Sequence, residues 1–118
     1  MADRPTCLID DFGPLPIESP LAVSDLGDLV QHAFAEHRAL YPAGGQTMMH
    51  RGLPPSRPGR VVDLRHLSRV IDYPTGDMTI TVQAGITWEK LQTILAKENQ
   101  RLPIDIPWPA DATLGGIL

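Results

Sequence analysis

The sequence is poor in cysteine, in aromatic residues and in long apolar runs. Cys7 is its only cysteine, which excludes a disulfide within the chain and a cysteine-based metal site. No stretch approaches the ~20 apolar residues of a membrane-spanning helix. The polar start, residues 1–5, has no apolar segment of signal-peptide length. We therefore expect a cytoplasmic protein without a transmembrane segment.

Excess positive charge is also lacking, because the formal net charge is −4. Such a balance argues against a nucleic-acid partner. The charge is unevenly distributed: residues 1–36 carry seven acids and one arginine, whereas residues 37–69 carry six arginines and one acid, Asp63. A basic middle could bind an anion or form a solvated surface.

Twelve prolines divide the chain into short segments. Residues 5–20 are acidic and rich in proline, which predicts an extended lead-in with little regular structure. Ser24 can cap a helix whose apolar residues recur at the spacing of one buried face. These residues are Leu26, Leu29, Val30, Ala33 and Phe34.

Short strands and one further helix are predicted after residue 39. Residues 40–42 and 61–64 read as strands separated by a proline-rich surface loop at 52–59, and residues 67–73 turn into another strand. Residues 74–77 have the composition of a turn, and residues 78–84 alternate apolar and polar, as in a half-buried strand. Thr87 can cap a second helix that fails near Asn99, with Trp88, Leu91, Ile94 and Leu95 as its apolar stripe.

Two glycine pairs carry the strongest functional signal. Gly44-Gly45 follows a short apolar run and precedes Thr47, while Gly115-Gly116 follows Thr113. Consecutive backbone N–H groups in such a loop form a nest that binds anions, most often phosphate. The alternatives are a plain loop for the first pair and a turn entering a strand for the second.

Five segments in this order resemble the FAD-linked oxidase family typified by vanillyl-alcohol oxidase and p-cresol methylhydroxylase. They are Pro42–Thr47, Val61–Leu64, Asp77–Gly85, Leu102–Asp105 and Ala112–Gly116. Within the family, the sequence is most similar to the FAD-binding subunit of bacterial glycolate oxidase. The resemblance runs from about residue 20 to the last residue. The ordered set is far more specific than either glycine pair alone.

The resemblance implies an α+β fold, the small first subdomain of a PCMH-type FAD-binding domain, with a short mixed sheet and two helices. Residues 1–20 would be the lead-in. Residues 21–118 would be the N-terminal part of that domain, which stops at the start of its second subdomain. We therefore expect the chain to be incomplete and inactive alone.

The implied cofactor is FAD, with its pyrophosphate on the first loop and its ribityl chain and ring along residues 107–116. Arg51 is the arginine closest to that loop. Family members that tether flavin covalently commonly carry histidine directly after the first glycine pair. Gln46 stands there, and His50 is a remote substitute, so we expect non-covalent FAD. The predicted cofactor-binding residues are Pro42, Ala43, Gly44, Gly45, Gln46, Thr47, Met48, Pro107, Ala112, Thr113, Gly115 and Gly116.

By resemblance, the function is FAD binding in an oxidoreductase that oxidises a small-molecule 2-hydroxy acid such as glycolate, with other subunits of a glycolate oxidase-like complex as partners. The alternative is a non-catalytic interaction subunit that keeps the fold without flavin chemistry. A nicotinamide-binding domain is disfavoured because its Gly-x-Gly-x-x-Gly fingerprint is missing. The four histidines fit no metal spacing, Asp105 and Asp111 form no credible acid/base pair, and no catalytic residue can be named.

Overall fold

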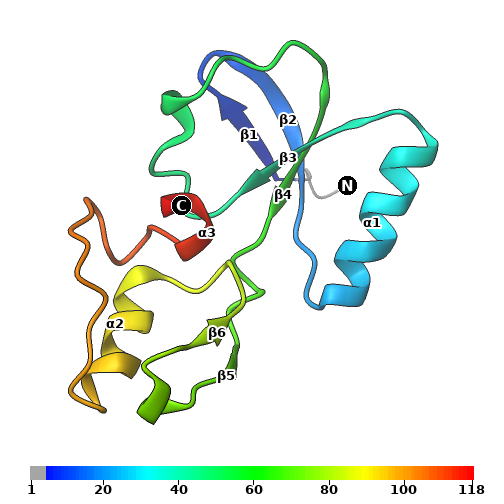
Figure 1. Cartoon of the computed structure of the whole chain (residues 1–118). Coiled ribbons are helices and arrows are strands. Elements are labelled where there is room, and N and C mark those ends of the chain that lie inside the picture. Colours follow the sequence, from blue (N-terminus) through cyan, green and yellow to red (C-terminus); the bar gives the residue numbers. More distant parts are fainter. Residues whose placement is uncertain (1–4) are drawn as a thin grey trace.

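A computed structural model describes residues 5–118, which form a four-stranded mixed sheet with one long helix and a smaller two-stranded part (Figure 1). The larger sheet has the strand order β1-β2-β4-β3. β2 and β3 both run parallel to the central β4, and β1 is antiparallel to β2. The bounds are β1 Thr6–Ile9, β2 Phe12–Glu18, β3 Ala39–Ala43 and β4 Gly59–Asp63.

The hairpin of β1 and β2 corrects the expectation of little regular structure before residue 20. Cys7 pairs with Leu15 across the hairpin, and both side chains are buried. The prolines within β2 argue against a strand in the sequence, because proline is rare inside strands. The alternation that buries Cys7 and Ile9 in β1 spans too few residues to predict a strand by itself. Residues 1–4 of the predicted lead-in lie outside the described residues.

The strands predicted at 40–42 and 61–64 are confirmed as β3 and β4. Val61 and Val62 of β4 are almost completely buried, as expected for a central parallel strand covered on both faces. The core of this sheet contains Cys7, Ile9, Leu15, Ala43 and Val61. The hairpin therefore packs beneath the end of β3, where the first glycine loop begins.

Helix α1 (Val23–Ala35) begins one residue before Ser24, and the N–H of Ala22 donates to the Asp25 carboxylate at 3.1 Å. The predicted buried face is only partly buried. Ala33 is covered, but Val30 and Phe34 are exposed, Phe34 by 82%. The sequence spacing located the helix correctly, but it could not show that α1 contacts little besides the neighbouring strand.

The second part contains β5 (Val70–Asp72), the antiparallel β6 (Thr81–Val82) and helix α2 (Trp88–Ala96). α2 is confirmed in detail. The Thr87 hydroxyl accepts from the Lys90 N–H at 3.3 Å, and Trp88 and Leu91 are buried. Its core consists of Ile86, Leu91 and Leu95.

Two local predictions are wrong in this part. The expected strand over 78–84 shrinks to the two residues of β6, because Met78 adopts a left-handed backbone (φ 54°) and is 77% exposed. The expected turn into a strand at Gly116 is instead a short helix, α3 (Leu114–Ile117), capped by the Thr113 hydroxyl. Single-turn 3₁₀ helices, η1 (Met49–Arg51) and η2 (Thr75–Asp77), complete the fold.

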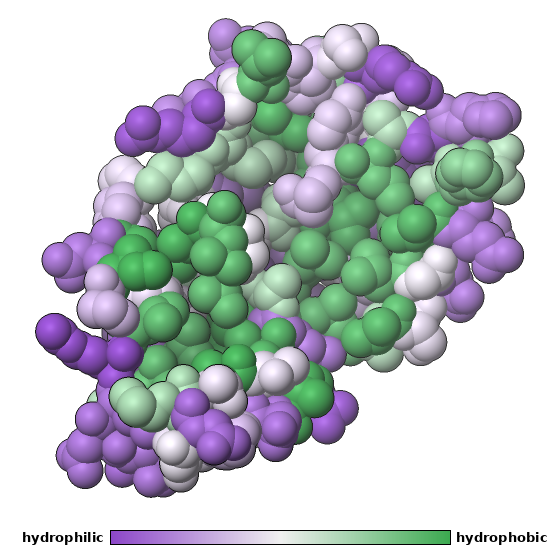
Figure 2. All heavy atoms as spheres, in the orientation of Figure 1, coloured by the Kyte–Doolittle hydropathy of each residue, from purple (hydrophilic) through white to green (hydrophobic). Residues whose placement is uncertain are grey.

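Hydrophobic residues gather across the middle of the face seen in Figure 2, over α3 and between the sheet and α1. None of the helices in residues 5–118 is long and apolar enough to cross a membrane.

Candidate functional site

The first glycine loop, residues 44–48, follows the carboxyl end of β3. Ala43 is buried at the end of that strand, and Gln46 turns the chain with a left-handed backbone (φ 59°). Among residues 5–118, no acceptor receives a hydrogen bond from the N–H of residues 44, 45, 46, 47 or 48. The loop therefore has five consecutive N–H groups that no acceptor among the described residues uses.

The second glycine segment, residues 111–116, lies directly against this loop. Thr113 is buried, and its hydroxyl accepts from the Gly116 N–H at 3.3 Å. The segment is held from the other side, because the Gly115 N–H donates to Ala84 O and the Leu114 N–H to Ile86 O, both at 2.9 Å. The short helix α3 thus ties the second part of the molecule to the loop after β3.

The glycines of the first loop are required by this contact between segments. A Cβ at Gly44 would lie 2.9 Å from the Thr113 Cγ2 and overlap its hydroxyl. A Cβ at Gly45 would overlap the carbonyl group of Asp111, with 2.6 Å to its carbon. The sequence interpretation related both glycines to phosphate approach. The structure adds a packing reason for them, because the space beside them is filled by Thr113 and Asp111.

Gly116 differs from that pair. A Cβ there would meet only the Thr113 hydroxyl, at 3.2 Å. A longer side chain at this position would project into the cavities that surround the two segments. Of the four glycines in the two pairs, Gly116 is therefore the one at which a Cβ would meet the least protein.

Three adjoining cavities surround the two glycine segments, with volumes of about 180, 430 and 260 Å³. All three are lined by Gly116. Every one of the twelve cofactor-binding residues predicted from the sequence lines at least one of them. The structure thus brings together two predicted groups that are about 60 residues apart in the sequence.

The cavities also have walls that the sequence reasoning missed. Leu64 and Ala84 line the cavity beside Gly44, while Asp105 and Ile106 line the one beside Arg51. Three of these residues lie inside segments that carried the family resemblance. The resemblance therefore included them, but neither the polarity nor the size of their side chains singled them out as residues of the site.

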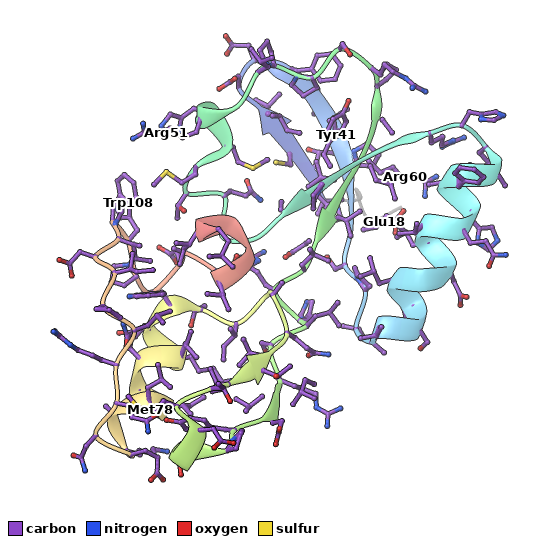
Figure 3. The ribbon with its side chains drawn as sticks, in the orientation of Figure 1. Glu18, Tyr41, Arg51, Arg60, Met78 and Trp108 are labelled. Carbon is purple, nitrogen blue, oxygen red and sulfur yellow. The ribbon has the colours of Figure 1, made fainter. Side chains whose placement is uncertain are left out.

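Arg51 is the only one of the six arginines between residues 37 and 69 that lines these cavities. In Figure 3 it lies on the same side of the molecule as Trp108. Trp108 is 60% exposed and lines none of the three cavities.

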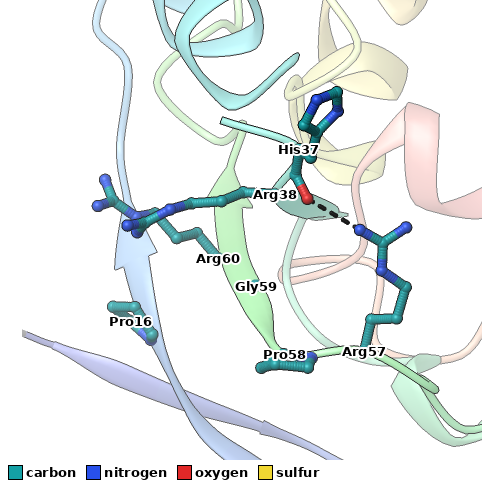
Figure 4. A pocket seen from close by; sticks show the side chains of 7 residues that line it. All are labelled: Pro16, His37, Arg38, Arg57, Pro58, Gly59 and Arg60. Atoms are coloured by element: carbon teal, nitrogen blue, oxygen red, sulfur yellow. Dashed lines mark hydrogen bonds between the residues drawn. The ribbon is translucent and has the colours of Figure 1, made fainter. Parts of the chain in front are cut away.

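Three other arginines surround a separate cavity of about 440 Å³ at the starts of β3 and β4 (Figure 4). This cavity lies at the opposite end of β3 from the glycine loop. Arg57 donates to the His37 carbonyl at 2.8 Å, Arg60 pairs with Glu18 at 2.8 Å, and Arg38 pairs with Glu36 at 2.9 Å. The basic middle of the sequence is therefore not one patch beside the loop.

Asp63 ends β4 next to the base of the loop and is the buried acid of this region. Its carboxylate accepts from the Arg65 guanidinium at 2.7 to 3.1 Å and from the Arg65 N–H at 3.0 Å. These hydrogen bonds from Arg65 hold the pKa of Asp63 below its ordinary value. Asp63 is thus a structural anion that fixes the turn after β4.

The candidate site has the donors and the space for a phosphate-containing cofactor. The free N–H groups of the loop suit a pyrophosphate, and the open side of Gly116 suits close approach of a flat group. No cluster of three or more histidine, cysteine, aspartate or glutamate residues within 5–118 could hold a metal ion.

Comparison with known proteins gives a consistent result. The FAD binding domain family matches residues 16–118. A curated relative, D-2-hydroxyglutarate dehydrogenase of Xanthomonas citri pv. viticola (strain LMG 965), is 29% identical over 103 residues, which are 87% of this chain and 22% of the relative.

Solved structures of alkyldihydroxyacetonephosphate synthase are also similar. One superposes with a TM-score of 0.73 at 28% identity, covering 85% of this chain and 21% of that chain. A second has the same TM-score at 27% identity, covering 85% and 19%. The chain spans about a fifth of the length of these relatives.

Proposed function

The chain belongs to the FAD binding domain family, and from this premise we propose that it forms the FAD-binding part of an oxidoreductase acting on a 2-hydroxy acid. The observation that carries the proposal is that residues 44–48, whose five N–H groups donate to no acceptor within residues 5–118, line the same cavity as Gly116. The substrate class follows the D-2-hydroxyglutarate dehydrogenase relative, whose name denotes such an acid. Within this class, we propose a small glycolate-like acid as the substrate.

In this proposal the loop residues bind and orient the cofactor. The N–H groups of 44–48 and the Thr47 hydroxyl would hold the pyrophosphate, with Arg51 adding positive charge. The segment 107–116 would hold the ribityl chain and ring, with Gly116 allowing close approach. Bound FAD supplies the two-electron acceptor for oxidation of the alcohol carbon.

We propose that attachment is non-covalent at this loop. Gln46 has an amide that can hydrogen-bond but not form a bond to the flavin. His50 is exposed and lines none of the three cavities. The loop therefore offers no group for a covalent link.

The substrate proposal is tested by adding 2-hydroxy acids anaerobically to the purified complete protein and following loss of oxidised-flavin absorbance. Glycolate, lactate and 2-hydroxyglutarate are compared with acetate, propionate and glutarate, which lack the hydroxyl. We expect bleaching by at least one hydroxy acid and by none of the controls. Bleaching by none of them would contradict the proposed reaction while leaving FAD binding intact.

The second candidate is a non-catalytic subunit of a larger complex. Exposed Val30 and Phe34 on α1 favour contact with another polypeptide surface. Flavin content separates the two candidates, since the non-catalytic subunit would purify without FAD.

A further inference from the structure

The hairpin of β1 and β2 begins ten residues before the family match, which starts at residue 16. It nevertheless contributes to the core beneath the glycine loop. Cys7 and Ile9 of β1 are buried together with Ala43, the last residue of β3, and with Val61. A segment outside the family match therefore supports the cofactor loop from below.

One side chain of this hairpin reaches the loop itself. The Cys7 thiol lies 3.3 Å from the side-chain oxygen Oε1 of Gln46, across 39 residues of sequence. Burial raises the pKa of Cys7, so the thiol keeps its proton and can donate. It lies equally close to the Leu8 carbonyl, so its single proton is divided between two acceptors.

Gln46 is the residue of the loop that needs support. Its φ of 59° lies in the left-handed region, which non-glycine residues occupy at a cost. This turn sets the direction of the N–H groups on both sides of it. A hydrogen bond to the Gln46 side chain stabilises the turn without occupying any of those donors.

We propose that Cys7 is a positioning residue for the FAD loop, acting through Gln46 to hold the left-handed turn that presents the N–H groups of residues 44–48. The inference rests on the proposed placement of FAD at this loop. It gives a role to a strand that the family match does not include. The proposal also predicts that substitutions of Cys7 and Gln46 have non-additive effects on the Kd for FAD.

A double-mutant cycle on the apo form of the complete protein tests this coupling. The Kd for FAD is measured by fluorescence titration for Cys7→Ala, Gln46→Ala and the double variant. We expect each single variant to weaken binding roughly two- to threefold, the low end for one hydrogen bond, because a thiol is a weak donor. The double variant should be little weaker than either single variant. Cys7→Ser keeps a donor and should restore part of the affinity.

Ile9→Val is the matched control, because Ile9 is buried in the same strand and the same core but has no hydrogen bond to the loop. It should lower the melting temperature and leave the Kd for FAD unchanged. Additive effects of Cys7→Ala and Gln46→Ala would overturn the proposal. So would a Cys7→Ala variant that loses stability at unchanged Kd.

A second readout does not depend on FAD. In the apoprotein, alkylation of Cys7 by iodoacetamide, followed by mass spectrometry, should be faster in Gln46→Ala than in wild type and unchanged in Gln92→Ala. Equal rates in Gln46→Ala and wild type would overturn the Cys7–Gln46 contact. Faster alkylation with no FAD binding by wild type would instead overturn the placement of FAD at the loop, and with it the positioning role.

Discussion

Gly45 and Gly116 lie on two sides of the same cavity, but the space beside them differs. At Gly45 the missing side chain makes room for Asp111, and at Gly116 it faces open space beyond the Thr113 hydroxyl. Sequence alone assigned both to the ligand. A glycine pair in the sequence indicates that another group packs closely against the backbone. Only the structure shows whether that group is protein, as at Gly45, or whether the space is open, as at Gly116.

Gly45→Ala should therefore destabilise the fold by about 1–3 kcal/mol, the usual cost of overpacking. Gly116→Ala should leave the melting temperature near that of wild type and weaken FAD binding. Gly52→Ala is the control, since a Cβ there meets no atom within 4 Å. Thermal unfolding and FAD titration of the three variants check this. An unchanged melting temperature for Gly45→Ala would contradict the packing argument.

The Asp63–Arg65 pair predicts a pH-dependent contribution to stability. Because Arg65 lowers the folded-state pKa of Asp63, the stabilisation is complete above the ordinary pKa of aspartate and is lost as the pH falls below about 4. Asp63→Asn should cost about 1–3 kcal/mol at pH 7 and clearly less at pH 3. Urea unfolding at both pH values measures it. An equal cost at both would show that the charge of Asp63 contributes nothing.

The elements differ in how far the sequence predicted them. Helix α2 was predicted with its N-cap and its apolar face, because both are encoded locally. The Thr87 hydroxyl accepts a hydrogen bond in the first turn, and Leu91 and Leu95 recur at helical spacing. The β1–β2 hairpin and α3 were missed, because their formation depends on distant partners. β1 buries Cys7 against β3 and β4, and α3 is fixed by hydrogen bonds to Ala84 and Ile86.

The packing of α2 gives a prediction at this scale. Leu91 is 1% exposed at the centre of the second core. Leu91→Ala should lower the free energy of unfolding by about 2–5 kcal/mol. Lys90→Ala, on the exposed side of the same helix, should change it by less than about 0.5 kcal/mol. Urea denaturation followed by tryptophan fluorescence compares them, and similar values for both would show that α2 does not form the core described.

At the scale of the whole molecule, the site lies where the loop after β3 meets the segment that leads into α3. The loop follows Ala43 of the first core, and Leu114 of α3 packs against the second core. The twelve residues predicted by resemblance all line the adjoining cavities, and their role in binding FAD stays a prediction. The resemblance could not predict that Gly44 and Gly45 are packed against Thr113 and Asp111, or that only one of the six arginines of residues 37–69 lines the cavities.

The chain of 118 residues, expressed by itself, should not retain stoichiometric FAD. Gly115, Gly116 and Pro107 are exposed, and Leu118 beside them is 91% exposed. The relatives it matches are about four times as long. Size-exclusion chromatography with flavin absorbance checks the expectation. A monomeric, cooperatively melting sample carrying one FAD per chain would contradict it.

The most direct test of the account is the flavin content of the purified complete protein before and after acid precipitation. We predict one FAD per chain in the native protein and all of it in the supernatant after precipitation, because in the proposed site the loop would bind FAD through backbone N–H groups and Gln46 could not tether it. A protein that purifies without flavin, or flavin that stays in the pellet with the polypeptide, would contradict the account.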